Sequence, residues 1–161
     1  MAAAPPPAPP PTVSVPAPSY APAFEPQSFE NPVQTAMAEL RRAEGLLKQG
    51  KYWDAIQVAE PLLDTVSGAL LVRTRVLLGQ AYLRNPNWLK RAAEQLQAAI
   101  ESDPRHAEAH FALGLVYKAS GLAQRAAAMF RKALELMPGH AEAQRELNAL
   151  EPTARRKLFS R

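Results

Sequence analysis

Three histidines carry most of the metal-binding chemistry that this sequence offers. His106 and His110 stand four residues apart, with Glu108 between them. On a helix this spacing puts two imidazoles on one face, where they could share a metal ion. The glutamate falls at the wrong step for the His-Glu-x-x-His pattern of zinc proteases, and His140 recurs 34 residues after His106. The histidines are therefore predicted to mark helix starts, and no metal site is expected.

The other reactive residue types are absent or scattered. The chain has no cysteine, which removes disulfides, thiolate catalysis and cysteine-based zinc sites and fits a reducing compartment. The serines are isolated, no glycine-rich phosphate loop occurs, and the carboxylates suit solvated helix faces. These observations predict a protein that is not an enzyme and that needs no cofactor.

The net charge of +4 belongs to the C-terminal end of the chain. Arg155, Arg156, Lys157 and Arg161 account for all of it, so no basic face for nucleic acid is expected. Basic and bulky apolar residues alternate there, as in a weak membrane or nucleic-acid contact, although a solvated terminus is the commoner arrangement. Residues 153–161 are accordingly predicted to be a basic tail.

The location of the protein is predicted from two sequence signals, a signal peptide and a membrane-spanning apolar run. No charge precedes Glu25, so a signal peptide is not indicated, and no run of 18 apolar residues exists for stable membrane insertion. A cytoplasmic protein is expected. The richness in alanine and the excess of arginine over lysine hint at a bacterial source.

Proline dominates the start of the chain. Residues 1–34 hold 11 of the 16 prolines, and proline builds neither helix ladders nor sheets. This segment is predicted to be a disordered tail or linker, with docking of its Pro-x-x-Pro spacings on a partner as the alternative. Tyr20, Phe24 and Phe29 suggest a further hypothesis. In it, the segment Tyr20–Phe29 folds back onto the repeats described below, where it caps their exposed end or competes for their groove.

The rest of the chain repeats with a period of 34 residues. At that offset residues 99–109 lie over residues 133–143, and seven of the eleven positions are identical. Apolar residues recur at helical spacing from Ala107 to Lys118, and Gly121 follows as a stop. The same holds from Leu122 to Met137, before Pro138. Each period is therefore predicted to be helix, turn, helix.

This pattern resembles the tetratricopeptide repeat (TPR) family. The residues that carry the resemblance are Leu113, Gly114, Tyr117, Ala126, Phe130, Ala133 and Pro138, and in the preceding unit Leu78, Gly79, Tyr82, Ala92, Leu96, Ala99 and Pro104. One extra residue in the turn Arg84–Trp88 is expected to lengthen a loop without touching the packing. A looser first unit is expected to be kinked or cut short at Pro61.

The resemblance implies an all-α fold, a short TPR-type α-solenoid of three antiparallel helix pairs and a capping helix. The expected domain spans residues 35–152, with repeats at about 36–66, 70–104 and 107–138 and a capping helix at 141–150. The array is expected to close with this single helix, because Pro152 follows it and because Gln144, Arg145 and Glu146 suit a solvated outer face.

The resemblance also implies a concave groove lined by the first helix of each pair. The matching positions are Met37, Leu40, Glu44, Leu47, Arg73, Val76, Gln80, Leu83, Glu108, Phe111, Leu115 and Lys118. Relatives that hold a C-terminal carboxylate use a clamp of Lys, Asn and Arg. The clamp positions here are Leu40, Glu44, Leu77, Glu108 and Ala112, which cannot bind a carboxylate. A protein or peptide ligand with apolar anchors is therefore expected. For Val76, Leu83, Phe111 and Leu115, a place in the core is the alternative.

Two functions remain open from the sequence. The first is an adaptor or scaffold that binds a peptide or helix of a partner in the groove. The second is a C-terminal regulatory or structural segment of a larger bacterial assembly, such as a J-domain protein or a signalling, secretion or pilus-type machine. The sequence also leaves homo-oligomerisation open.

Overall fold

The structure is a computed structural model that describes the backbone of residues 31–159 and the side chains up to residue 150. Every regular element within this range is a helix. The α-helices are α1 (Pro32–Lys48), α2 (Tyr52–Ala59), α3 (Gly68–Tyr82), α4 (Leu89–Ser102), α5 (Ala107–Ala119), α6 (Ala123–Leu136) and α7 (Ala141–Phe159), and the short 3₁₀ helices are η1 (Glu60–Asp64) and η2 (Pro86–Trp88).

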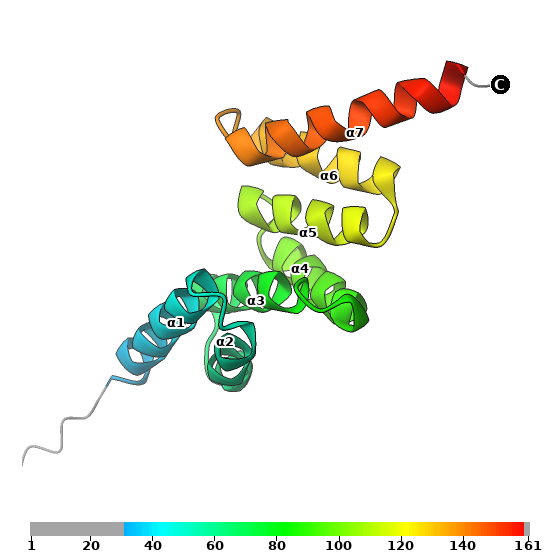
Figure 1. Cartoon of the computed structure of the whole chain (residues 1–161). Coiled ribbons are helices and arrows are strands. Elements are labelled where there is room, and N and C mark those ends of the chain that lie inside the picture. Colours follow the sequence, from blue (N-terminus) through cyan, green and yellow to red (C-terminus); the bar gives the residue numbers. More distant parts are fainter. Residues whose placement is uncertain (1–30, 160–161) are drawn as a thin grey trace, which may run out of the picture.

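The helices form antiparallel pairs that stack in chain order. Figure 1 shows α1 with α2, α3 with α4 and α5 with α6 following one another, with α7 closing the stack. Each helix packs mainly against the next one in the chain, and each first helix also touches the first helix of the neighbouring pair. The all-α prediction of three helix pairs and a closing helix is confirmed.

Glycines at two equivalent turns let the chain reverse. Gly50 follows α1 and Gly121 follows α5, each with φ of +76°, a conformation that side chains with a Cβ rarely adopt. The amide of each glycine hydrogen-bonds to the end of the preceding helix. The prediction that Gly121 ends the helix from Ala107 is confirmed.

Small residues let the two helices of a pair approach closely. A Cβ on Gly79 would lie 2.4 Å from Cγ of Leu96, and one on Gly114 would lie 2.5 Å from Cε1 of Phe130. Both distances are far below van der Waals contact, so only glycine fits opposite the large side chain. The first pair carries Ala43 and Ala59 at these two positions.

The first helix begins earlier than the sequence analysis predicted. It starts at Pro32, with Asn31 as its cap: Oδ1 of Asn31 accepts a hydrogen bond from the amide of Val33 at 3.1 Å. Asparagine before a proline is a favoured helix start, since proline at the first position loses no needed donor. Residues 32–34 therefore belong to the domain and not to the tail.

Pro61 was expected to kink or shorten the second helix of the first pair. α2 ends at Ala59, and η1 continues the chain with Pro61 in its first turn. The predicted shortening at Pro61 is confirmed. The prediction for the turn after α3 is wrong, because this turn forms η2, whose half-buried Trp88 packs against the core and against Tyr82.

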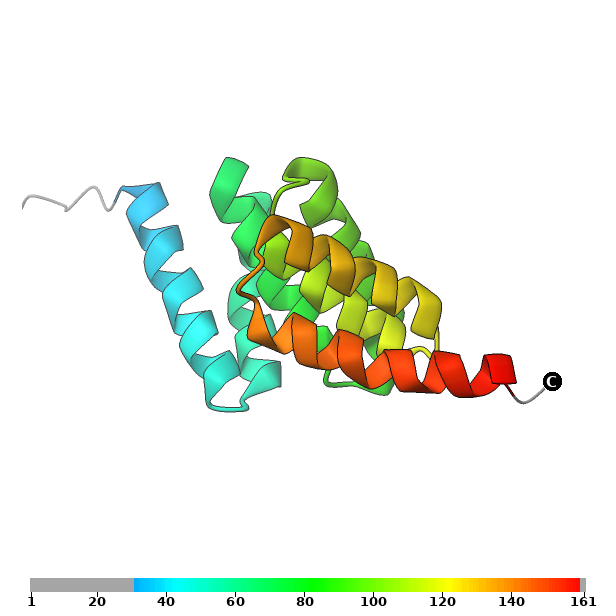
Figure 2. The same ribbon diagram turned by 90° about the horizontal axis from the view of Figure 1, so that it is seen from above.

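The last helix runs past the predicted end at Leu150. α7 continues through Pro152 to Phe159, so residues 153–159 extend this helix instead of starting a separate tail, and Figure 2 shows it passing the end of α6. Alanine, leucine, lysine and arginine after Pro152 favour helix, while Pro152 leaves one carbonyl without its intrahelical donor. The hypothesis about Tyr20–Phe29 concerns residues outside the described range. No described helix is long and apolar enough to cross a membrane.

Candidate partner-binding face

The first helices of the pairs are linked to one another by polar side chains. Nη2 of Arg73 on α3 donates a hydrogen bond to Oε1 of Glu44 on α1 at 2.6 Å. Both residues were predicted to line the groove. We call the side of α1, α3 and α5 that carries the twelve predicted positions the first-helix face.

Glu108 joins three helices on this face. Its Oε1 accepts a hydrogen bond from Nε2 of Gln80 on α3 at 2.8 Å. Its Oε2 lies 3.2 Å from Nε2 of His140, at the start of α7. Nδ1 of His140 accepts from the amide of Ala143, so the ring proton stands on Nε2 and is donated to Glu108.

Lys118 on α5 completes the series, since its Nζ pairs with Oε2 of Glu146 on α7. The predicted polar groove residues Glu44, Arg73, Gln80, Glu108 and Lys118 thus all bind partners within the chain. Because these pairs are partly exposed, each adds little stability. Arg73 and Lys118 each pair with a glutamate, so these two cations are not free to bind a ligand.

Three of the predicted groove residues are buried. Leu40 and Val76 belong to the main core, and Phe111 is only 5% exposed. The Phe111 ring lies 5.7 Å from that of Phe130 and 4.5 Å from that of His140, between centroids. Leu40, Val76 and Phe111 therefore belong to the packed interior, and a partner cannot reach their side chains.

The remaining apolar positions are accessible. Met37 is exposed, and Leu47, Leu83 and Leu115 are half-buried beside the core. Of the twelve predicted residues, these four present apolar surface to solvent. Their role in binding remains a prediction.

The predicted role of the histidines at helix starts is confirmed for His106 and His140. Nδ1 of each ring accepts a hydrogen bond from the amide three residues on, at 3.2 Å and 3.3 Å. His110 lies within α5, where its Nε2 donates to the carbonyl of Pro104 at 2.9 Å. Its buried Nδ1 finds no partner among the described residues. No group of three metal-binding side chains gathers in the described range.

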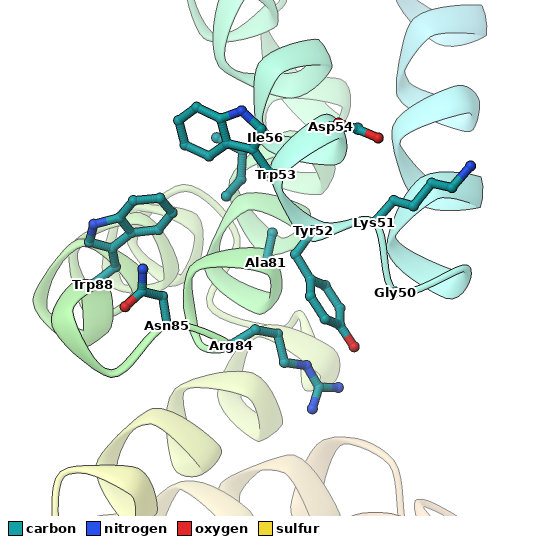
Figure 3. Close-up of a pocket in the computed structure, with 10 residues that line it drawn as sticks. All are labelled: Gly50, Lys51, Tyr52, Trp53, Asp54, Ile56, Ala81, Arg84, Asn85 and Trp88. Carbon is teal, nitrogen blue, oxygen red and sulfur yellow. The ribbon is translucent and has the colours of Figure 1, made fainter.

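An aromatic pocket at the turns was not predicted. It has a volume of about 500 Å³ and lies between the α1–α2 turn and the α3–α4 turn. Figure 3 shows Trp53 and Trp88 along one wall of the pocket, and Tyr52 and Arg84 along the opposite wall. We call it the turn pocket and define it by Tyr52, Trp53, Ile56, Ala81, Arg84 and Trp88.

A sequence signal for the turn pocket did exist. Trp53 is the second residue of α2, and Trp88 is the cap residue just before α4, so each tryptophan lies at the start of the second helix of its pair. Stacking of the units brings their ring centroids to 5.7 Å.

Tyr82 packs against Trp88, one of the residues that line the turn pocket. Its hydroxyl donates to Oε1 of Glu60, and its ring meets Trp88 edge-on at 5.8 Å. Burial, followed by the hydrogen bond to Glu60 and the charge of that carboxylate, raises the pKa of Tyr82 to about 12. The nearby Arg91, above the ring, acts in the opposite direction.

Comparisons with known proteins agree with this geometry. Residues 76–141 match the model of the tetratricopeptide repeat family. A search of the curated proteins by sequence finds no match.

Several solved structures share the fold. The first TPR domain of human RPAP3 is 22% identical with a TM-score of 0.69, covering 78% of this chain and 97% of that one. The second TPR domain of human RPAP3, in complex with the HSP70 peptide SGPTIEEVD, is 27% identical with a TM-score of 0.64, covering 74% and 98%.

A TPR protein of Thermus thermophilus extends the likeness to a bacterium. It is 27% identical with a TM-score of 0.68, and the match covers 78% of this chain and 68% of that one. The match to the family model and these neighbours point the same way. The described helices form a tetratricopeptide repeat fold, and over residues 76–141 the chain matches the tetratricopeptide repeat family.

Proposed function

We propose that the protein is an adaptor that binds a peptide or a helix of a partner on its first-helix face. The observation that carries this proposal is that the polar and the apolar side chains of this face differ in what they contact. The polar groups are paired within the chain, whereas Leu47, Leu83 and Leu115 remain partly exposed. Apolar side chains of a partner that cover these leucines would bury apolar surface, which favours binding.

The charges of the face indicate which ligands it disfavours. The second RPAP3 domain was solved with a peptide that ends in Glu-Glu-Val-Asp. Here the clamp positions hold Glu44 and Glu108, already bonded to Arg73 and to His140, together with buried Leu40, Leu77 and Ala112. At these five positions a ligand carboxylate would meet two carboxylates and no cation. We therefore infer a ligand with apolar anchors and no acidic terminus.

The place of the adaptor in a cell is part of the same proposal. We place it in the bacterial cytoplasm, as its composition and lack of cysteine suggest.

The proposal can be tested by selecting ligands from a phage-displayed library of random peptides on the full-length chain. We expect enriched sequences with spaced apolar residues. Leu83→Ala and Leu115→Ala should each weaken their binding by about tenfold.

Leu122→Ala serves as the matched control, because Leu122 is a leucine 42% exposed at the α5–α6 turn. Enrichment of acidic C-termini, or equal losses in Leu122→Ala and Leu83→Ala, would contradict the proposal.

A further inference from the structure

We propose that the turn pocket is a second binding site, separate from the first-helix face, and that it holds the proline run Pro5–Pro11 of the same chain. The chain has two tryptophans in all, Trp53 and Trp88, and both lie in this pocket. Trp53 is 56% exposed although its ring touches Trp88. Clustered aromatic surface left open to water is typical of an interaction site.

The walls of the pocket suit a proline-rich segment. Ala81 and Ile56 lie between the tryptophans and Tyr52, whose ring is covered by the guanidinium of Arg84 at 5.3 Å (Figure 3). Pyrrolidine rings pack well against aromatic faces, and proline-rich recognition commonly uses aromatic-lined grooves.

The hydrogen-bonding groups also match. Six of the seven residues from Pro5 to Pro11 are prolines without an amide hydrogen, so the run offers almost only carbonyl acceptors. Donor groups of this kind occur on residues that line the pocket, namely Lys51, Trp53, Arg84 and Trp88.

The run is close enough in the chain to reach the pocket. Asn31 stands at one end of α1 and the pocket at the other, after Gly50, so the gap is about 25 Å for a helix of 17 residues. The 19 residues between Pro11 and Asn31 can span about 60 Å when extended. A tether of this length gives a local concentration in the millimolar range, which favours the chain's own run over a dilute competitor.

The fluorescence of Trp53 and Trp88 can be used to measure whether the turn pocket is covered. Acrylamide quenching of their fluorescence reports on this pocket alone, because the chain holds no other tryptophan. The full chain is compared with a tail variant. That variant carries Pro5→Ser, Pro6→Ser, Pro7→Ser, Pro9→Ser, Pro10→Ser and Pro11→Ser.

The proposal predicts that quenching increases in the tail variant. A second variant replaces the other tail prolines as a matched control and should quench like the full chain. It carries Pro16→Ser, Pro18→Ser, Pro22→Ser and Pro26→Ser. Equal quenching in the full chain and the tail variant would overturn the proposal, as would the same increase in both variants.

A second arm measures the binding itself. A fluorescein-labelled peptide of residues 4–12 should bind the tail variant saturably and lose affinity by about tenfold or more with Trp53→Ala. Trp53 is mostly exposed, so thermal melting should show the fold intact. Absence of saturable binding, or binding unaffected by Trp53→Ala, would contradict the site.

The concentration dependence identifies whose run is bound. Protection that is constant with dilution, in a chain that sediments as a monomer, supports occupancy within one molecule. Protection that rises with concentration alongside dimerisation would assign the pocket to the run of a second copy and overturn the proposal as stated.

Discussion

Gly114 on α5 faces the ring of Phe130 on α6 so closely that a Cβ would lie 2.5 Å from Cε1 of the ring. Phe130 is fully buried and cannot move aside without disturbing its neighbours. Gly79 and Leu96 stand in the same relation one repeat earlier.

Alanine at these glycines should destabilise the fold. We expect Gly114→Ala and Gly79→Ala to lower the free energy of unfolding by about 1–3 kcal/mol through overpacking, measured by urea denaturation. Gly45 is the matched control, because a Cβ there meets nothing within 4 Å. Gly45→Ala should stabilise α1 by about 0.5–1 kcal/mol. Similar effects at Gly45 and Gly114 would contradict the close approach.

Phe111 should behave as a core residue and not as a contact for a partner. Because its ring is buried against Phe130 and His140, Phe111→Ala should cost about 3–5 kcal/mol of stability. Leu115→Ala, at a half-buried position on the same helix, should cost clearly less. Urea denaturation of both variants decides this, and equal losses would mean that Phe111 is not buried.

Stability should fall at alkaline pH because of Tyr82. Its pKa is raised from 10.0 to about 12 in the folded chain, so the unfolded chain releases the proton first. The stabilising contribution is complete below about pH 10 and is lost as the pH rises towards 12.

Tyr82→Phe provides the comparison, since phenylalanine has no proton to lose. The variant should be less stable near pH 9, by about 1 kcal/mol for the lost hydrogen bond to Glu60. Its urea midpoint should fall less than that of the unchanged protein between about pH 9 and pH 11. Parallel falls in the two proteins would rule out this role for Tyr82.

The fold could be predicted from the sequence because the repeat aligns residues that pack against each other. Gly114 and Phe130 repeat the spacing of Gly79 and Leu96 once the extra turn residue is counted. Element ends were less predictable. The start at Pro32 depended on a single capping asparagine, and Pro152 proved compatible with a continuing helix.

The binding face could be predicted only in part. Helical spacing places Phe111 and Leu115 on one face, but it does not show that the start of α7 covers Phe111 with His140. The turn pocket depends on how far each repeat turns relative to the next, which no local pattern specifies. This explains why the pocket between Trp53 and Trp88 was not predicted, although each tryptophan lies at the start of a second helix.

The most direct test of the adaptor proposal is methyl NMR of the full chain with leucine, isoleucine and alanine methyls labelled. The probe is a peptide selected from the random library. We predict saturable shifts at Leu47, Leu83 and Leu115, with Leu122 unchanged. Shifts confined to Ile56 and Ala81 at the turn pocket, or no shifts at all, would contradict binding on the first-helix face.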